Sequence, residues 1–183
     1  MYAINDNLQA MESRSRITDA LLALMRQYPY KDITITQICQ EAQIVRQTYY
    51  RNFDSKDDIL RFYLDNMVRK YFTDYYKIQD VYAQLNDFFS YMLKSREFLL
   101  LASENSLFFM IDETITMNIT NFINFRELTT IDDPKTEKYV TGFIASTICS
   151  LLSLWTNSGF LESPWMMSQL AQRFLSGLSS KVA

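Results

Sequence analysis

Glycine and proline are scarce in this chain, which has three of each among 183 residues. Tight turns between strands depend on these two residue types, so the chain has too few turn-forming residues for an all-β fold. Long helices are therefore favoured. Hydrophobic residues make up 48% of the chain and aromatic residues 15%, enough to fill a sizeable core. We therefore expect an all-α protein, and no segment has the pattern of a convincing strand.

Apolar spacings of three and four residues, together with capping signals, divide the chain into about nine helices. Thr34 and Gln37 have the spacing of a capping box, Ser55 is placed as an N-cap, and Ser163 precedes Pro164 as a helix start. The expected helices cover residues 12–28, 35–42, 45–52, 56–77, 80–94, 96–103, 106–127 and 134–157, and a last one that starts at Pro164.

The residues that the chain lacks exclude several kinds of site. It has no histidine, which removes Ser-His-Asp and Cys-His nucleophile systems and HExxH metal sites. Cys39 and Cys149 lie far apart and match no zinc spacing, so we expect buried thiols in a reducing cytoplasm. Nucleophile–base pairs and phosphate-binding loops are also missing. We predict that the protein is not an enzyme and needs no metal or cofactor.

One stretch has to be weighed as a membrane span. Residues 139–161 contain no charged side chain and are long enough to cross a bilayer. The stretch also carries serine, threonine and asparagine throughout, whereas a true span is predominantly apolar. We predict a helix buried between protein surfaces and no membrane association. Residues 1–11 are polar and have no basic start, so no secretory signal is expected.

The three short N-terminal helices have the pattern of a helix-turn-helix module. Such a module needs two packed helices, a tight turn, and a second helix whose polar side chains reach base edges in the major groove. Ile44, Tyr49 and Phe53 can face inward. The residues left for an outer face are of types that bond bases and phosphates: Arg46, Gln47, Thr48, Tyr50, Arg51 and Asn52.

The same residues resemble the DNA-binding region of the tetracycline-repressor (TetR) family. Residues 33–42 and 46–60 are similar to it, and the specific part is Thr-Tyr-Tyr-Arg-Asn-Phe-Asp-Ser-Lys at 48–56, where the family has T-[FY]-Y-x-[HY]-F-x-[SN]-K. A second, shorter similarity covers residues 154–160 followed by Ser163-Pro164. It matches one branch of the family, which includes a coactivator of dihydroxyacetone-kinase genes.

The resemblance implies roles for individual residues. Arg46, Gln47 and Thr48 stand where family members read bases, and Tyr50, Asn52 and Lys56 stand at backbone-contacting positions. Thr34 and Thr36 are placed to bond phosphate, although a cap alone also explains Thr34. Tyr49 is expected in the core, and Arg51 can be a solvated side chain.

Two departures from the family pattern and the charge of this region favour an alternative. Gln43 replaces the usual turn glycine, and Val45 replaces a capping serine or threonine, at a cost of about 1 kcal/mol each. Residues 1–60 hold seven Lys or Arg and eight Asp or Glu, a net charge of 7 − 8 = −1. A TetR-like coactivator that has lost DNA binding and acts through a protein partner is therefore a second hypothesis.

The resemblance implies a DNA-binding domain over residues 1–55 and a helical ligand-binding and dimerisation domain over 56–183. Simple core packing explains any one of its aromatic residues, but as a set they can enclose an apolar effector. Our pocket candidates are Phe88, Tyr91, Met92, Phe109 and Phe122. A stripe of small residues, Gly142, Ser146 and Ser150, permits close approach of helices.

Beside that stripe, the predicted dimer interface consists of Ile144, Ile148, Leu151, Leu152, Trp155 and Phe174. The alternative is that these helices only close the core of one chain. We favour the dimer because a helix-turn-helix reader needs two half-sites one DNA turn apart. The prediction is thus a cytoplasmic, homodimeric transcription regulator that binds double-stranded DNA and a small-molecule effector, with repression as the family default.

Overall fold

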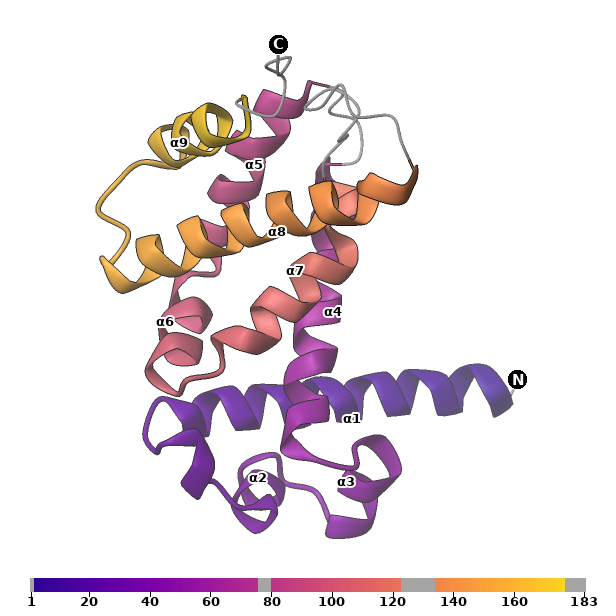
Figure 1. Cartoon of the computed structure of the whole chain (residues 1–183). Coiled ribbons are helices and arrows are strands. Elements are labelled where there is room, and N and C mark those ends of the chain that lie inside the picture. Colours follow the sequence, from indigo (N-terminus) through magenta and orange to yellow (C-terminus); the bar gives the residue numbers. More distant parts are fainter. Residues whose placement is uncertain (1, 76–79, 123–133, 177–183) are drawn as a thin grey trace. The chain divides into compact units, whose positions relative to one another are not determined.

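A computed structural model describes residues 2–75, 80–122 and 134–176, and the residues in these ranges form helices and their connections without a strand (Figure 1). The chain divides into two compact units, Met1–Asn66 and Met67–Ala183. The division falls within helix α4 (Lys56–Tyr75), which begins in the first unit and ends in the second. The predicted domain boundary between residues 55 and 56 lies at the start of the same helix.

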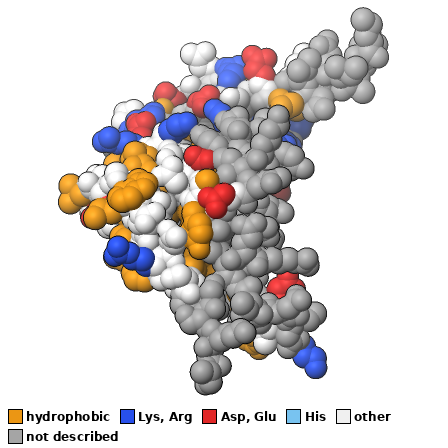
Figure 2. All heavy atoms as spheres, turned by 90° about the horizontal axis from the view of Figure 1, so that it is seen from above, with side chains coloured by type: hydrophobic (Ala, Val, Ile, Leu, Met, Phe, Trp, Pro, Cys, Tyr) orange, Lys and Arg blue, Asp and Glu red, His pale blue; other side chains and the backbone are white. Residues whose placement is uncertain are grey.

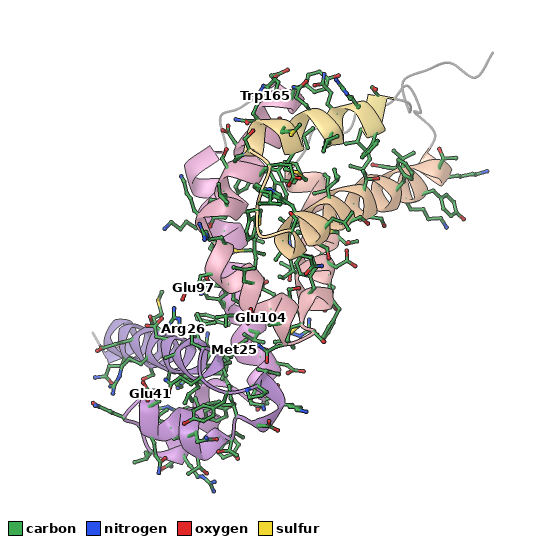
Figure 3. The ribbon with its side chains drawn as sticks, turned by 90° about the vertical axis from the view of Figure 1, so that its left-hand side faces the viewer. Met25, Arg26, Glu41, Glu97, Glu104 and Trp165 are labelled. Carbon is green, nitrogen blue, oxygen red and sulfur yellow. The ribbon has the colours of Figure 1, made fainter. Side chains whose placement is uncertain are left out.

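The first unit holds α1 (Tyr2–Met25), a short 3-10 helix η1 (Tyr30–Asp32), α2 (Ile35–Glu41), α3 (Arg46–Asn52) and the start of α4. α1 packs against both α2 and α3. Its start at Tyr2 lies well before residue 12, where the apolar pattern of the sequence begins. The helix ends near Met25 and Arg26, which Figure 3 labels.

Two of the expected caps are present in this unit. Gln37 N donates to Thr34 Oγ1 at 3.3 Å while Thr34 N donates to Gln37 Oε1 at 2.8 Å, so the predicted capping box is confirmed. At the start of α4, Asp58 N donates to Ser55 Oγ and Ser55 N donates to the Asp58 carboxylate. Each exchange satisfies amides that a helix start leaves without a partner in the helix.

The described residues of the second unit form the end of α4 and five further helices. α9 packs mainly on α5, and α8 packs on α7, α6 and α9. The aromatic rings of Phe88, Phe89 and Trp155 meet edge to face in its core. The helices are α5 (Val81–Lys94), α6 (Arg96–Glu104), α7 (Phe108–Phe122), α8 (Pro134–Asn157) and α9 (Pro164–Ser176).

The helix weighed as a membrane span is α8. By length and composition its residues Lys135–Asn157 suffice to cross a bilayer, with a mean hydropathy of 1.4, but half of its most apolar window is buried in the fold. Ile144, Ile148 and Leu152 on its inner face are fully buried. α8 is thus a core helix of the second unit.

Candidate nucleic-acid interface

The turn between α2 and α3 passes through a left-handed residue. Gln43 has a φ of +53°, the conformation expected at the position where the pattern would place glycine. Ile44 N donates to Cys39 O at 2.9 Å and Gln43 N to Gln40 O at 3.1 Å, which closes the end of α2. Without a glycine, this backbone conformation costs roughly 1 kcal/mol.

The start of α3 lacks a side-chain cap. Val45 occupies the N-cap position with extended backbone angles, and its side chain accepts no hydrogen bond. Two-thirds of Val45 is exposed. The amides at the beginning of α3 therefore remain available to water or to an anionic ligand.

The inner face of α3 joins the core of the first unit. Tyr49 is fully buried and Phe53 nearly so, whereas Ile44 is half-buried. The Tyr49 hydroxyl has no hydrogen-bond partner among the described residues. Burial raises the pKa of this phenol to about 12. Tyr49 is a core residue, as expected.

The outer face of α3 presents polar side chains. Arg46, Gln47, Arg51 and Tyr50 are exposed, with 55% of Tyr50 accessible. Arg46 Nη2 donates to Thr36 Oγ1 in the first turn of α2, so two predicted contact residues on different helices are brought together. The exposed edge of the α2–α3 pair therefore combines hydroxyl, amide and guanidinium donors, the groups that bond bases and phosphates.

The remaining predicted contact residues have partners within the chain. Thr48 and Asn52 are half-buried, and Asn52 Nδ2 donates to Thr48 O at 2.8 Å. Thr34 is exposed and caps α2. The Thr34 hydroxyl also lies 2.8 Å from Gln37 Oε1.

Lys56 is held by the backbone around η1. Its Nζ donates to Tyr30 O at 2.7 Å and to Ile33 O at 2.6 Å, and it lies 3.4 Å from Lys31 O. The same ammonium lies 4.6 Å from the centre of the Tyr30 ring. Burial lowers the pKa of Lys56. Lys56 therefore fixes the segment that leads into α2, a positioning role that the sequence did not suggest.

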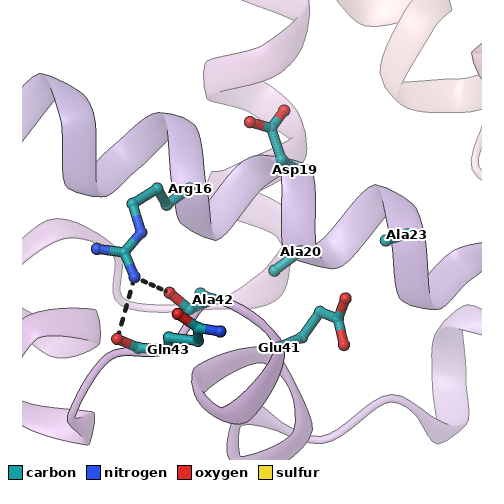
Figure 4. Close-up of a pocket in the computed structure, with 7 residues that line it drawn as sticks. All are labelled: Arg16, Asp19, Ala20, Ala23, Glu41, Ala42 and Gln43. Carbon is teal, nitrogen blue, oxygen red and sulfur yellow. Dashed lines mark hydrogen bonds between the residues drawn. The ribbon is translucent and has the colours of Figure 1, made fainter.

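Arg16 of α1 holds the turn itself. Its Nη2 donates to Ala42 O at 2.6 Å and to Gln43 O at 3.1 Å (Figure 4). Sequence reasoning missed this contact because backbone carbonyls carry no residue-specific signal. The two hydrogen bonds join α1 to the peptide units on both sides of the strained residue.

Residues 17–61, which include the last part of α1 and all of α2 and α3, match the family described as bacterial regulatory proteins, tetR family. These residues form a TetR-family domain. The match indicates a bacterial regulatory protein with an N-terminal DNA-binding domain. No curated protein sequence matches the chain significantly.

Two solved structures share the fold of this chain. A TetR transcriptional regulator from Streptococcus agalactiae 2603V superimposes with a TM-score of 0.68 at 15% sequence identity, over 94% of this chain and 98% of that chain. The dihydroxyacetone kinase operon activator DhaS superimposes with a TM-score of 0.55 at 19% identity, over 90% of this chain and 94% of that chain. At these identities the likeness establishes the fold alone.

The predicted effector-pocket residues lie in different surroundings. Phe88, Tyr91 and Met92 on α5 are buried, and Tyr91 donates its hydroxyl to Met67 O at 2.8 Å. Phe109 is 58% exposed and lines an open groove of about 540 Å³ between α7 and α8. The side chain of Phe122 lies outside the described residues. The structure thus brings three of the five candidates together on α5.

Most of the predicted dimer residues face the interior of their own chain. Phe174 is half exposed, whereas Ile144, Ile148, Leu151, Leu152 and Trp155 are buried. Trp155 Nε1 also donates to Glu162 O at 3.0 Å. These five residues are core residues of the second unit, which is the alternative that the sequence left open, and the interface prediction remains for Phe174.

The exposed face of α8 carries a different set of residues. Phe143, Ser146, Ser150 and Leu154 follow one another at intervals of three and four residues and are all exposed. With Phe174 of α9 they line an open, largely apolar groove of about 480 Å³. Seen from the side of α9, hydrophobic side chains gather in one part of the described surface (Figure 2).

Proposed function

We propose that this TetR-family protein is a ligand-responsive repressor that binds its operator as a homodimer in the cytoplasm. The observation that carries the proposal is the exposed polar edge of the packed α2–α3 pair, with Arg46, Gln47 and Tyr50 on the outer face of α3. A short recognition helix of this kind presents its side chains to base edges in the major groove.

Each residue of this edge has a role that its chemistry supports. Arg46 suits O6 and N7 of guanine and Gln47 suits N6 and N7 of adenine, with Thr48 beside them. Tyr50 and Asn52 contact the DNA backbone, and Thr34 and Thr36 bond phosphate at the start of α2. Lys56 was assigned a backbone contact by the family pattern. We now assign it a positioning role, because its ammonium already has carbonyl acceptors.

Dimerisation is proposed through the exposed face of α8 and α9. Phe143, Leu154 and Phe174 offer apolar area, and Ser146 and Ser150 between them permit a second copy of α8 to approach closely. A patch of this kind is self-complementary about a two-fold axis, so one surface serves both protomers. Two recognition helices would then meet two half-sites.

The proposed effector is a small apolar molecule bound by the second unit. α4 runs from the first unit into the second as one uninterrupted helix. This continuity supports a mechanical link between the effector site and the DNA-binding helices. A ligand that binds one position of α4 better than another shifts the population of the two states. A shift of a few Å would take two recognition helices out of register with half-sites one DNA turn apart.

The test is binding of the purified protein to the DNA upstream of its own gene, across a salt series. We expect specific, salt-dependent binding that the double variant Arg46→Ala/Tyr50→Ala loses. A panel of apolar compounds that raise the melting temperature would then be screened for release of the DNA. A ligand that leaves operator affinity unchanged contradicts the coupling.

A coactivator without DNA binding is the second candidate. The left-handed Gln43, the uncapped Val45 and the net acidic N-terminal segment favour it. DhaS, which shares the fold, is described as an operon activator. A folded dimer that shows no specific DNA binding at low salt would favour this candidate, and loss of reporter expression on gene deletion would indicate activation in place of repression.

A further inference from the structure

The α2–α3 turn of this chain is poorly stabilised by its own residues. Gln43 adopts a φ of +53° without being glycine, and Val45 gives α3 no side-chain cap. The turn and the first residues of α3 decide where Arg46 and Gln47 lie. Both features therefore loosen the position of the recognition helix unless a contact from outside the turn holds it.

Arg16 supplies such a contact. Its guanidinium donates from one nitrogen to the carbonyls of Ala42 and Gln43, at 2.6 and 3.1 Å. These carbonyls end α2 and flank the strained residue, so they carry the partial negative charge of a helix C-terminus. Hydrogen bonds from a charged donor to such groups are about twice as strong as neutral ones.

Arg16 reaches the turn from α1. It lines a pocket of about 320 Å³ between α1 and α2. Ala20 and Ala23 line the same pocket, and Figure 4 shows the guanidinium reaching from α1 to the carbonyls of the turn. Asp19 and Glu41 also line this pocket, with their carboxylates turned away from the guanidinium in Figure 4.

We propose that Arg16 is a positioning residue for DNA recognition: it clamps the left-handed turn and thereby sets the place of α3. It acts through the turn and leaves the contact with bases and phosphates to α2 and α3. This inference rests on the proposed DNA binding, but its structural half concerns the free protein and is tested there first.

The first test is amide hydrogen exchange of the free full-length protein. Arg16→Ala is expected to speed exchange at Ile44 and over α3 about tenfold, while α5 and α8 keep their protection. Gln43→Gly removes the backbone strain that the clamp opposes, so Arg16→Ala/Gln43→Gly should recover most of the lost protection. Arg16→Lys, which keeps one donor and the charge, should fall between the wild type and Arg16→Ala and serves if Arg16→Ala does not fold.

The second test is affinity for the DNA upstream of the gene, measured across a salt series. Arg16→Ala is expected to weaken binding about tenfold, with the slope of log affinity against log salt unchanged and with partial rescue by Gln43→Gly. Arg96→Ala is the matched control, because it removes one exposed positive charge from the second unit. It should leave both measurements unchanged.

Two results would overturn the proposal. In the first, Arg16→Ala lowers the slope of log affinity against log salt by about one, and Gln43→Gly does not restore the affinity. Arg16 would then be a phosphate ligand. Unchanged exchange in the turn and α3 would mean that the turn holds without the clamp. If the wild type binds no DNA, the exchange data still decide whether Arg16 clamps the turn in the free protein. Failure of the proposed DNA binding can therefore be told apart from failure of the clamp.

Discussion

The guanidinium of Arg46, the first residue of α3, donates through Nη2 to the hydroxyl of Thr36 in the first turn of α2. Both residues are exposed. The hydrogen bond holds a long, flexible side chain in one direction before any DNA is present. Ordering a side chain in advance reduces the entropy lost on binding.

We predict that Thr36→Val weakens base discrimination by Arg46. The variant keeps the shape of the residue but removes the hydroxyl acceptor, at a cost of about 1 kcal/mol in specific affinity. The measurement compares the preferred duplex with duplexes substituted at each position. Thr36→Ser should retain the wild-type pattern, and an undiminished preference in Thr36→Val would show that the contact does not orient Arg46.

Tyr49 provides a prediction about stability. Its hydroxyl is buried without a partner among the described residues, and an unsatisfied buried polar group costs about 1–3 kcal/mol. Tyr49→Phe should therefore raise the free energy of unfolding by about 1 kcal/mol at neutral pH. Urea denaturation followed by circular dichroism measures it. A less stable variant would reveal a hydrogen bond to ordered water.

The Tyr49 phenol should also make the free energy of unfolding fall at high pH. The pKa of Tyr49 rises from 10.0 to about 12 in the folded chain. The unfolded state therefore releases this proton first, and stability falls as the pH rises from about 10 to about 12, by up to roughly 3 kcal/mol. The stability difference between Tyr49→Phe and the wild type should widen over that range, and a constant difference would contradict the shift.

Several features of the helix-turn-helix could be predicted from local signals in the sequence. The left-handed turn at Gln43 was expected from the resemblance, which places a glycine there. The capping box of Thr34 and Gln37 and the cap at Ser55 are decided by residues within a few positions of one another. Such features depend on backbone geometry that side-chain type reveals directly.

Contacts over long sequence distances could not be predicted in this way. Arg16 and Lys56 each donate to backbone carbonyls more than twenty residues away, and any residue type can supply a carbonyl. The two faces of α8 could not be told apart for a related reason. Apolar side chains on both faces of α8 look alike in the sequence, but Ile148 lies in the core and Leu154 at the surface. Only the packing of α6, α7 and α9 on α8 separates the two faces.

A substitution of Lys56 tests whether this residue positions the segment before α2 or contacts a phosphate. Lys56→Met keeps much of the apolar stem over Tyr30 but loses the donor to Tyr30 O and Ile33 O. We expect a loss of about 2 kcal/mol in stability and weaker DNA binding with an unchanged salt slope. Denaturation and a salt series measure the two effects. A slope lower by about one at unchanged stability would restore the backbone contact that the family pattern implies.

The exposed face of α8 gives the last prediction. Leu154 is 68% exposed and lines the groove with Phe143 and Phe174, so Leu154→Arg should leave the fold intact while placing a charge in the proposed dimer interface. Sedimentation equilibrium is expected to show a monomer, with a dissociation constant raised at least about a hundredfold. DNA affinity should fall with it, because a monomer meets one half-site.

Two further substitutions make the dimer result specific. Leu161→Arg changes an even more exposed leucine, which lies outside the groove residues, and should leave the dimer intact. Ile148→Arg places a charge in the core of the second unit and should unfold it, with lost helical circular dichroism. If Leu154→Arg stays dimeric while Leu161→Arg dissociates, the interface lies on the α8–α9 connection and the proposed face is wrong.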